Sequence, residues 1–262
     1  MVEQHLSVTT SDYVTTLTIN RPEKRNALTY DMLQTLKDTV ENLADDPHTR
    51  VLVLSGAGDR AFSSGLDLNS VLTRVTDHPN APLDHDLIHT AMQAVEVHPN
   101  PVIAMINGDA FAGGCELALH CDFRLMVDTA RIGMPLVKRG LMIPYPLILK
   151  LVRMVGPVTS TEILLRGAPL SANRAWELGL INRVLPRADL ESETMNLAAE
   201  LAGNAPLAAR AFKKGIARAS SPDADRYAKE MFELLVRVMN SEDAREGLLA
   251  FIEKRSPNYR GR

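Results

Sequence analysis

Apolar runs of two kinds predict the strands of this chain. Residues 14–20 alternate apolar with polar positions, which predicts a strand with one buried face, and Arg21 and Pro22 end it. Residues 51–55 and 101–106 are short continuous apolar runs, as expected for strands that are covered on both faces. Residues 123–127 predict a further strand. The pattern therefore indicates a sheet that is largely buried.

A helical period of apolar positions separates these strands. Thr29 is the expected N-cap of a helix that runs to Leu43. One face of this helix carries Leu33, Leu36, Val40 and Leu43. Residues 86–97 and 113–120 predict two more helices. Strands that alternate with helices predict a mixed α/β fold for this part of the chain.

The character of the chain changes near residue 185. Residues 189–251 carry helix signals almost throughout. The expected helix starts lie near Pro206, Pro222 and Ser241. We therefore divide the chain into an α/β region, residues 1–185, and a helical region, residues 186–262. The amphipathic helices of the second region need a surface to cover, which is either the chain's own core or a neighbouring subunit.

Composition narrows the class of protein further. The chain has 262 residues, of which 45% are hydrophobic and 23% charged, so a large core is expected and disorder is not. The net charge of −3 gives no global reason to expect nucleic acid or an anionic membrane as a partner. Cys115 and Cys121 are the two cysteines and make no disulfide framework. With no visible signal peptide or apolar span, we expect a soluble cytoplasmic protein.

Two glycine-containing segments carry the candidate chemistry. Residues 61–67 (AFSSGLD) follow the 51–55 strand, and residues 107–116 (NGDAFAGGCE) follow the 101–106 strand and lead into a helix. Missing side chains let a ligand approach the backbone, and the first N–H groups of a helix have no internal partner. Either segment alone is more often a tight turn without a ligand. Together they can direct two N–H groups at one oxygen.

This pair of segments resembles the crotonase (enoyl-CoA hydratase/isomerase) superfamily. The resemblance continues in residues 20–28 (NRPEKRNAL), Cys121-Asp122, residues 175–184 (AWELGLINRV) and the tail at 246–258 (EGLLAFIEKRSPN). It implies a crotonase-like α/β spiral of β-β-α units with a helical C-terminal region used in assembly. It also implies a homotrimer or hexamer (a dimer of trimers) and acyl-CoA thioester substrates. No cofactor beyond the coenzyme A of the substrate, and no metal, is expected.

The resemblance also assigns candidate site residues. It implies that the thioester carbonyl lies between the backbone N–H groups of Ser64 and Gly113, because an enolate beside a thioester needs preorganised donors. Glu116, one turn beyond Gly113, matches an acid/base glutamate of the hydratases. The alternative for Glu116 is a carboxylate that only favours the helix macrodipole. The other substrate contacts that the resemblance implies are Arg25, Ala27, Ala61, Ser63, Gly65, Leu66, Asp67, Gly114 and Leu136.

Position 136 departs from the family pattern. The second hydratase glutamate should lie there, and the same position supplies the base of many isomerases in the family, but this chain has Leu136. Leucine carries no proton, and residues 140–144 offer no acid in its place. We therefore expect weak or altered hydratase activity, with a divergent isomerase, hydrolase or lyase, or a non-catalytic acyl-CoA-binding protein, as alternatives. An apolar lining for an acyl chain is expected from Met134, Leu136, Leu141, Met142 and Ile143.

Other titratable groups have weaker claims on chemistry. His85 and His89 are four residues apart and can share a helix face, so His89 is a candidate base, although a solvent-exposed histidine is the better interpretation. Their spacing also suits a metal pair, but no third ligand accompanies it. Asp67 is expected to cap the segment that follows it, and Asp122 to support the entry of a strand.

Four basic residues lie close to the candidate site segments, although the net charge of the chain is negative. They are Arg21, Lys24, Arg25 and Arg60. In the family these regions lie near coenzyme A, whose phosphates suit cationic side chains, arginine above all. A solvated basic turn is the alternative for Lys24.

Overall fold

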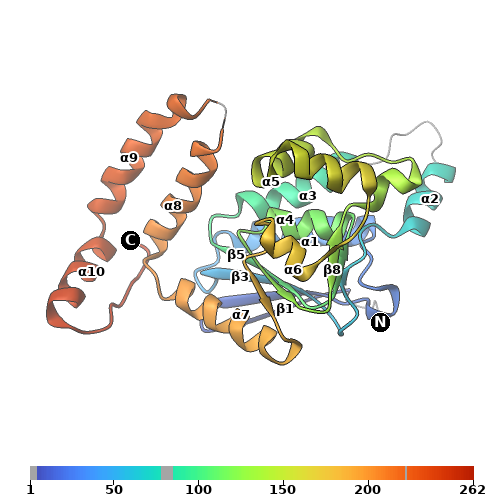
Figure 1. Cartoon of the computed structure of the whole chain (residues 1–262). Helices are drawn as coiled ribbons and strands as arrows, with labels where there is room; N and C mark the ends of the chain where they lie inside the picture. Colours follow the sequence, from blue (N-terminus) through green and yellow to red (C-terminus); the bar gives the residue numbers. More distant parts are fainter. Residues whose placement is uncertain (1–4, 78–84, 222) are drawn as a thin grey trace.

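The computed structural model describes residues 5–77, 85–221 and 223–262, which form two β-sheets, packed helices and a C-terminal helical arm (Figure 1). The larger sheet has the order β1 (Leu6–Ser11), β2 (Val14–Ile19), β3 (Val51–Gly56), β5 (Val102–Ile106), β7 (Phe123–Val127) and β10 (Arg183–Leu185). β1 is antiparallel to β2, and every other neighbouring pair is parallel. Strands β3 and β5 are almost wholly buried, as their continuous apolar runs predict, and β7 is buried to a similar extent.

A smaller sheet lies beside the first and positions the candidate site. Its order is β4 (Ala61–Ser63), β6 (Asp109–Phe111), β8 (Arg131–Gly133) and β9 (Leu170–Ser171). β4, β6 and β8 are parallel, whereas β9 is antiparallel to β8. Three successive turns of the chain, which begin at β3, β5 and β7, each add one strand to the large sheet, one to the small sheet and then helix, as in β5-β6-α4. The predicted spiral of β-β-α units is therefore confirmed.

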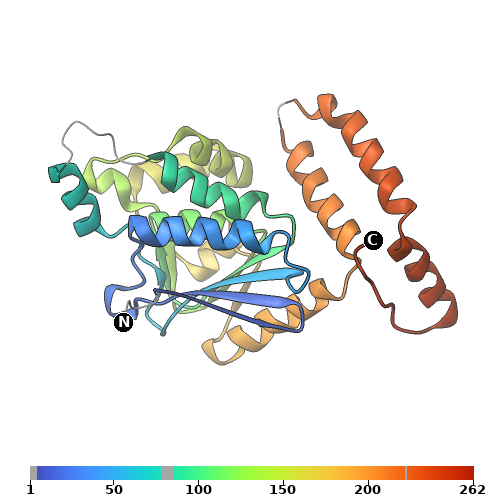
Figure 2. The same cartoon turned by 180° about the vertical axis from the view of Figure 1, so that it is seen from behind.

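Helices cover both faces of the large sheet. On one face α1 (Tyr30–Leu43) packs on α3 (His85–Val97), which packs on α4 (Gly113–His120). On the opposite face α7 (Arg187–Ala202) packs against β3, β5 and β7 (Figures 1 and 2). The remaining elements of this region are η1 (Pro22–Lys24), α2 (Leu68–Asp77), η2 (Pro135–Arg139), α5 (Tyr145–Arg166) and α6 (Ala172–Glu177). Gly156, with φ +75°, interrupts α5 and divides it into two helical segments.

The C-terminal part forms an arm that projects from this body (Figures 1 and 2). It comprises α8 (Pro206–Ala219), η3 (Ala224–Tyr227), α9 (Ala228–Met239) and α10 (Glu242–Glu253). The predicted starts at Pro206 and Ser241 are confirmed, and the Ser241 hydroxyl accepts the Ala244 N–H at 3.1 Å. The predicted start at Pro222 falls outside the described residues. None of the helices described is both long and apolar enough to cross a membrane.

The arm is tied to the body by polar contacts at its base. Lys213 on α8 donates to Asp122 at 2.6 Å, and the same carboxylate accepts the Val102 N–H at the start of β5, at 2.7 Å. Arg50 in the body donates to the carbonyl oxygen of Tyr259, which follows α10, at 2.8 Å. The prediction that Asp122 supports a strand entry is therefore confirmed. The predicted division at residue 185 separates α7 from the sheet that this helix covers, so the arm proper begins at α8.

Candidate active site

Three segments meet at the carboxyl edge of the small sheet. Residues 64–67 follow β4, residues 112–116 follow β6, and residues 134–136 follow β8, and these three strands are parallel. The Ala112 N–H donates to the Gly133 carbonyl at 3.0 Å, which joins the second segment to the third. Carboxyl ends of parallel strands are a common place for ligand sites. The structure therefore brings the two glycine-containing segments and position 136 to one edge.

Glycine is required where the first two segments touch. A Cβ atom on Gly65 would lie 2.8 Å from the Gly113 nitrogen, and one on Gly114 would lie 2.1 Å from the Ser63 carbonyl oxygen. Both distances are shorter than a carbon atom tolerates against backbone. Gly65 also has φ +93°, a conformation that side chains disfavour. The glycines thus allow the two backbone segments to approach each other.

The Ser64 amide does not point into the site. Its N–H donates to the Arg25 carbonyl oxygen at 3.0 Å. The prediction that this amide is one of two free donors is therefore wrong, because its hydrogen is already used within the protein. Ser63 is also engaged, since its hydroxyl donates to the Asn26 carbonyl and accepts the Gly65 N–H.

Leu66 supplies the free amide instead. The Leu28 N–H donates to the Gly65 carbonyl and the Leu28 carbonyl accepts the Asp67 N–H, both at 2.8 Å. The residues before and after Leu66 are therefore hydrogen-bonded to Leu28. The N–H groups of Leu66 and of Gly113, the first residue of α4, have no acceptor among the residues that the structure describes. A Cβ atom built on Gly113 would lie 3.5 Å from the Leu66 nitrogen. Two unpaired amides therefore lie close together.

Strain is built into the turn that presents Gly113. Ala112, the residue before α4, has φ +48° and ψ −119°. A non-glycine residue in such a region costs on the order of 1–3 kcal/mol, and surrounding structure must hold it there. The holding contacts include the Ala112 N–H bond to Gly133 and the Glu116 N–H bond to the Ala112 carbonyl, at 2.9 Å.

Glu116 is the buried carboxyl of the site. Its residue is 8% exposed, and no side-chain hydrogen bond to it is found among the described residues. Burial raises the pKa of Glu116 to about 7, and the positive charge of Lys150 opposes part of this rise. A carboxyl group with such a pKa is populated in both its acid and its base form at neutral pH.

Position 136 adds an apolar side chain. Leu136 lies in η2 and packs partly buried against the core. Of the other residues expected to line an acyl pocket, Met134 and Ile143 are buried in the core, whereas Leu141 and Met142 are exposed. Position 136 therefore adds no second carboxyl group beside Glu116.

The four basic residues have different roles. Arg21 donates to the Asp67 carboxylate at 3.1 Å and to the Ala27 carbonyl at 3.0 Å, so it holds the site together. The prediction that Arg21 meets phosphates is therefore wrong, because its guanidinium is engaged within the protein. Lys24, Arg25 and Arg60 are exposed and form no ion pair within the described part of the chain. The backbone carbonyls of Ala27 and Ala61, two other expected contacts, accept hydrogen bonds from Arg21 and Asn26.

Asp67 acts as a cap, as predicted. Its carboxylate accepts the N–H groups of Asn69 and Ser70 at the start of α2. Burial alone would raise the pKa of Asp67, but these N–H groups and Arg21 outweigh burial and lower it. Asp67 is thus an ionised structural group rather than a proton carrier.

Of the two histidines on α3, the structure describes the side chain of His89. His89 is exposed, as the better interpretation predicted, and the side chain of His85 lies outside the described residues. Over residues 5–77, 85–221 and 223–262, no three His, Cys, Asp or Glu side chains gather as ligands for a metal ion.

A charged cluster that the sequence analysis missed lies behind Glu116. Lys150 on α5 pairs with Glu96 on α3 at 2.9 Å, and Glu96 lies 3.4 Å from the His120 ring on α4. The available signal was a lysine beside buried positions of α5, Leu147 and Leu151. Its partners are far away in the sequence.

Known proteins resemble this chain over its full length. The model of the enoyl-CoA hydratase/isomerase family matches residues 9–262. A crotonyl-CoA hydratase of Syntrophomonas wolfei is 31% identical over 259 residues, with 99% of each chain covered. A carnitinyl-CoA dehydratase of Escherichia coli K12 is 34% identical over 266 aligned positions, with 100% of each chain covered. A crystal structure of an enoyl-CoA hydratase from Bacillus anthracis superposes with a TM-score of 0.89 at 32% identity, covering 99% of this chain and 100% of that one.

Proposed function

The chain belongs to the enoyl-CoA hydratase/isomerase family, and from this premise we propose that it binds an acyl-CoA thioester and stabilises the enolate formed from it. The observation that carries the proposal is the pair of unpaired amides at Leu66 and Gly113, with Glu116 one helical turn away. Two N–H groups suit an oxygen that gains negative charge, and removal of one donor from an oxyanion hole costs about 10²–10³ in rate in other enzymes.

Glu116 is the proton carrier of this proposal. As a carboxylate it takes a proton from water while the water oxygen adds to the β-carbon of a 2-enoyl thioester. The electron pair of the double bond moves onto the thioester oxygen, where the amides of Leu66 and Gly113 stabilise the enolate. The protonated Glu116 then returns the proton to the α-carbon, which completes the addition of water. Coenzyme A stays attached to the product, and the reaction uses no other cofactor.

Leu136 limits this chemistry. With one carboxyl group, the protein orients water less well than a pair of carboxylates would. We therefore expect slow hydration, and a shift of the double bond by the same enolate is the related alternative. Leu136 also favours a second candidate function, an acyl-CoA-binding protein without turnover, because an apolar side chain suits an acyl chain and moves no proton.

Three exposed basic side chains are candidates to bind the coenzyme A part of the ligand. Lys24, Arg25 and Arg60 lie on the segments that lead into the site and have no carboxylate partner among the described residues. Phosphates with several negative charges are recognised by such side chains. We assign these residues to the phosphates of coenzyme A.

A direct experiment separates the candidates. Loss of enoyl absorbance is followed for crotonyl-CoA and longer 2-enoyl-CoA thioesters, with wild type and Glu116→Ala. Turnover that requires Glu116 supports the enzyme, and equal rates in both proteins exclude Glu116 as its catalyst. Binding of the thioesters without turnover at any chain length supports the binding protein.

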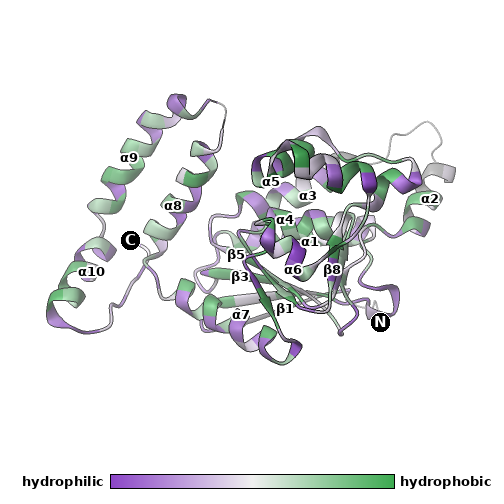
Figure 3. Cartoon of the chain, in the orientation of Figure 1, coloured by the Kyte–Doolittle hydropathy of each residue, from purple (hydrophilic) through white to green (hydrophobic). Residues whose placement is uncertain are grey.

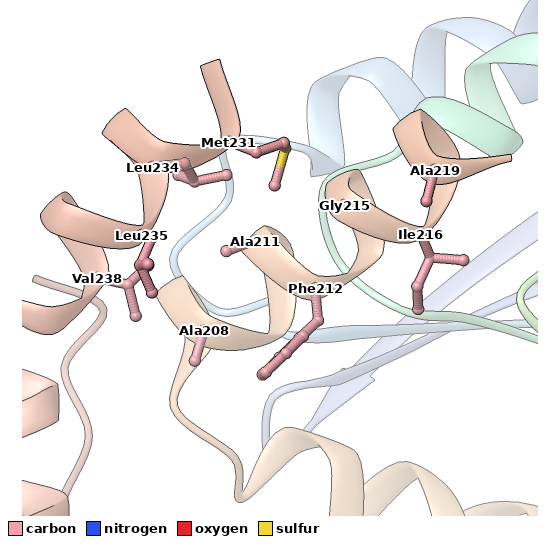
Figure 4. A pocket seen from close by; sticks show the side chains of 10 residues that line it. All are labelled: Ala208, Ala211, Phe212, Gly215, Ile216, Ala219, Met231, Leu234, Leu235 and Val238. Carbon is pink, nitrogen blue, oxygen red and sulfur yellow. The ribbon is translucent and has the colours of Figure 1, made fainter. Parts of the chain in front are cut away.

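We also propose that the arm assembles the protein into trimers or hexamers. Phe212 on α8 is 74% exposed and Phe251 on α10 is 85% exposed, and apolar residues recur along the arm (Figure 3). Side chains of α8 and α9 line an apolar groove of about 330 Å³ (Figure 4). A free surface of this kind is unusual for a monomer. Light scattering at micromolar concentration tests the proposal, and a monomer would contradict it.

A further inference from the structure

The cluster behind Glu116 joins three helices. Lys150 on α5 donates to one oxygen of Glu96 on α3 at 2.9 Å, and the other oxygen of Glu96 lies 3.4 Å from Nε2 of His120 on α4. Nδ1 of His120 lies 2.8 Å from the backbone carbonyl of Glu116. The contacts thus run from Lys150 to the backbone of Glu116.

Lys150 is the positive charge of this cluster. A carbonyl oxygen only accepts, so Nδ1 of His120 carries a hydrogen and donates it to Glu116. Burial lowers the pKa of His120 to about 4, so the ring is neutral at pH 7. Burial raises the pKa of Glu96, but the charge and hydrogen bond of Lys150, together with His120 and Lys213, outweigh burial and lower it, so Glu96 is ionised. The ammonium of Lys150 and the carboxylate of Glu96 therefore form the ion pair.

The placement of Lys150 is specific. Its side chain is 20% exposed and lies between Leu147 and Leu151, which are buried in the core. A half-exposed partner, Glu96, holds the ammonium on this inner side of α5. A lysine is unusual on a helix face that packs against the body of the protein. The position of Lys150 therefore indicates a role beyond that of a surface ion pair.

We propose that Lys150 is a positioning residue for Glu116: its ammonium, anchored by Glu96, stabilises the ionised form of the Glu116 carboxyl. The proposal rests on the role of Glu116 as acid and base. Burial and the Lys150 charge act on Glu116 in opposite directions, and their balance leaves both forms of the carboxyl populated near neutral pH.

Other charged or titratable groups around the cluster do not replace Lys150. They are Cys115 on α4, His89 on α3 and Lys213 on α8. Burial raises the pKa of Cys115 to about 12, so this thiol is neutral. His89 acts on His120, and Lys213 acts on Glu96 and is bound to Asp122. Lys150 is the cation whose charge acts on Glu116 itself.

The test measures the ionisation of Glu116 without any need for turnover. Carboxyl-labelled glutamate is followed by ¹³C NMR as a function of pH, and Glu116→Gln identifies the signal. In Lys150→Met the midpoint should rise by about one pH unit, at the lower end of the effect of a nearby opposite charge, because Glu96 shares that charge. Lys150→Arg keeps the charge and should keep the midpoint. Arg153→Met removes an exposed charge from the same helix and should leave the midpoint unchanged.

An unchanged midpoint in Lys150→Met would overturn the proposal, as would an equal rise in Lys150→Arg. If Lys150→Met does not fold, Lys150→Gln serves in the same titration. Where turnover is found, the acid limb of kcat/KM should move upward with the NMR midpoint. A wild type that binds acyl-CoA without turnover would refute the proposed enzyme, whereas the titration would still decide whether Lys150 controls Glu116.

Discussion

Replacement of Gly65 by alanine tests the position of the two amides. The new Cβ atom would lie 2.8 Å from the Gly113 nitrogen and 2.9 Å from the Phe111 carbonyl oxygen. Neither atom belongs to a flexible side chain, so the two backbone segments must separate. Ordinary contact begins at 3.4 Å, so the gap must open by about 0.6 Å at the Gly113 nitrogen.

This displacement is large on the scale of the site. Donors of an oxyanion hole act at about 2.7–3.1 Å, so one amide that moves by several tenths of an ångström is largely lost as a donor. We expect turnover to fall by about 10²–10³. Overpacking costs about 1–3 kcal/mol of stability, and the left-handed backbone of residue 65 costs a further 1–2 kcal/mol.

Gly179→Ala is the matched control. Gly179 also has a positive φ, +76°, but no atom lies within 4 Å of a Cβ built there. This variant should lose about 1–2 kcal/mol and keep its affinity for acyl-CoA and its turnover. Denaturant unfolding measures the stability of both variants, and titration calorimetry and enoyl absorbance measure their function. Equal binding and turnover in the two variants would refute the location of the amide pair.

Four further predictions concern single side chains. The pKa of Glu116 is raised from 4.5 to about 7 in the folded protein, so the free energy of unfolding of wild type falls as the pH rises between these values. Glu116→Gln lacks this titration, and its stability relative to wild type should therefore increase by up to about 3 kcal/mol from pH 4 to pH 8, as measured by denaturant unfolding. Leu136→Glu should raise hydration of crotonyl-CoA; no rise in a folded variant would mean that the site geometry has diverged as well. Arg21→Met should cost about 3 kcal/mol of stability through the loss of its Asp67 pair, whereas Arg25→Met should weaken acyl-CoA but not acyl-pantetheine in binding titrations.

The sequence predicted the fold best where strands are buried on both faces. β3 and β5 are continuous apolar runs, and Thr29 caps α1 through its hydroxyl, which accepts the Met32 N–H as predicted. β1 was missed because Leu6 is its single buried residue. The short strands β4, β6 and β8 were missed because three residues carry no periodicity.

The sequence predicted which segments form the site but not which of their atoms are free to bind a ligand. The glycines mark where two backbones approach, yet which amide is free depends on φ at Gly65 and on hydrogen bonds to Leu28, far away in the sequence. Arg21 looks like a phosphate contact until its partner Asp67 is seen. The pair of Lys150 and Glu96 is likewise created by the packing of α5 on α3.

Exchange of the α-hydrogen reports on enolate formation by Glu116 alone, because it needs neither hydration nor isomerisation. A saturated acyl-CoA is incubated with the protein in deuterated water, and deuterium at the carbon beside the thioester is measured by mass spectrometry. The account predicts that wild type exchanges this hydrogen through the enolate and that Glu116→Gln, with unchanged affinity, does not. A bound thioester that gains no deuterium, or gains it equally in both proteins, would contradict an enolate formed by Glu116.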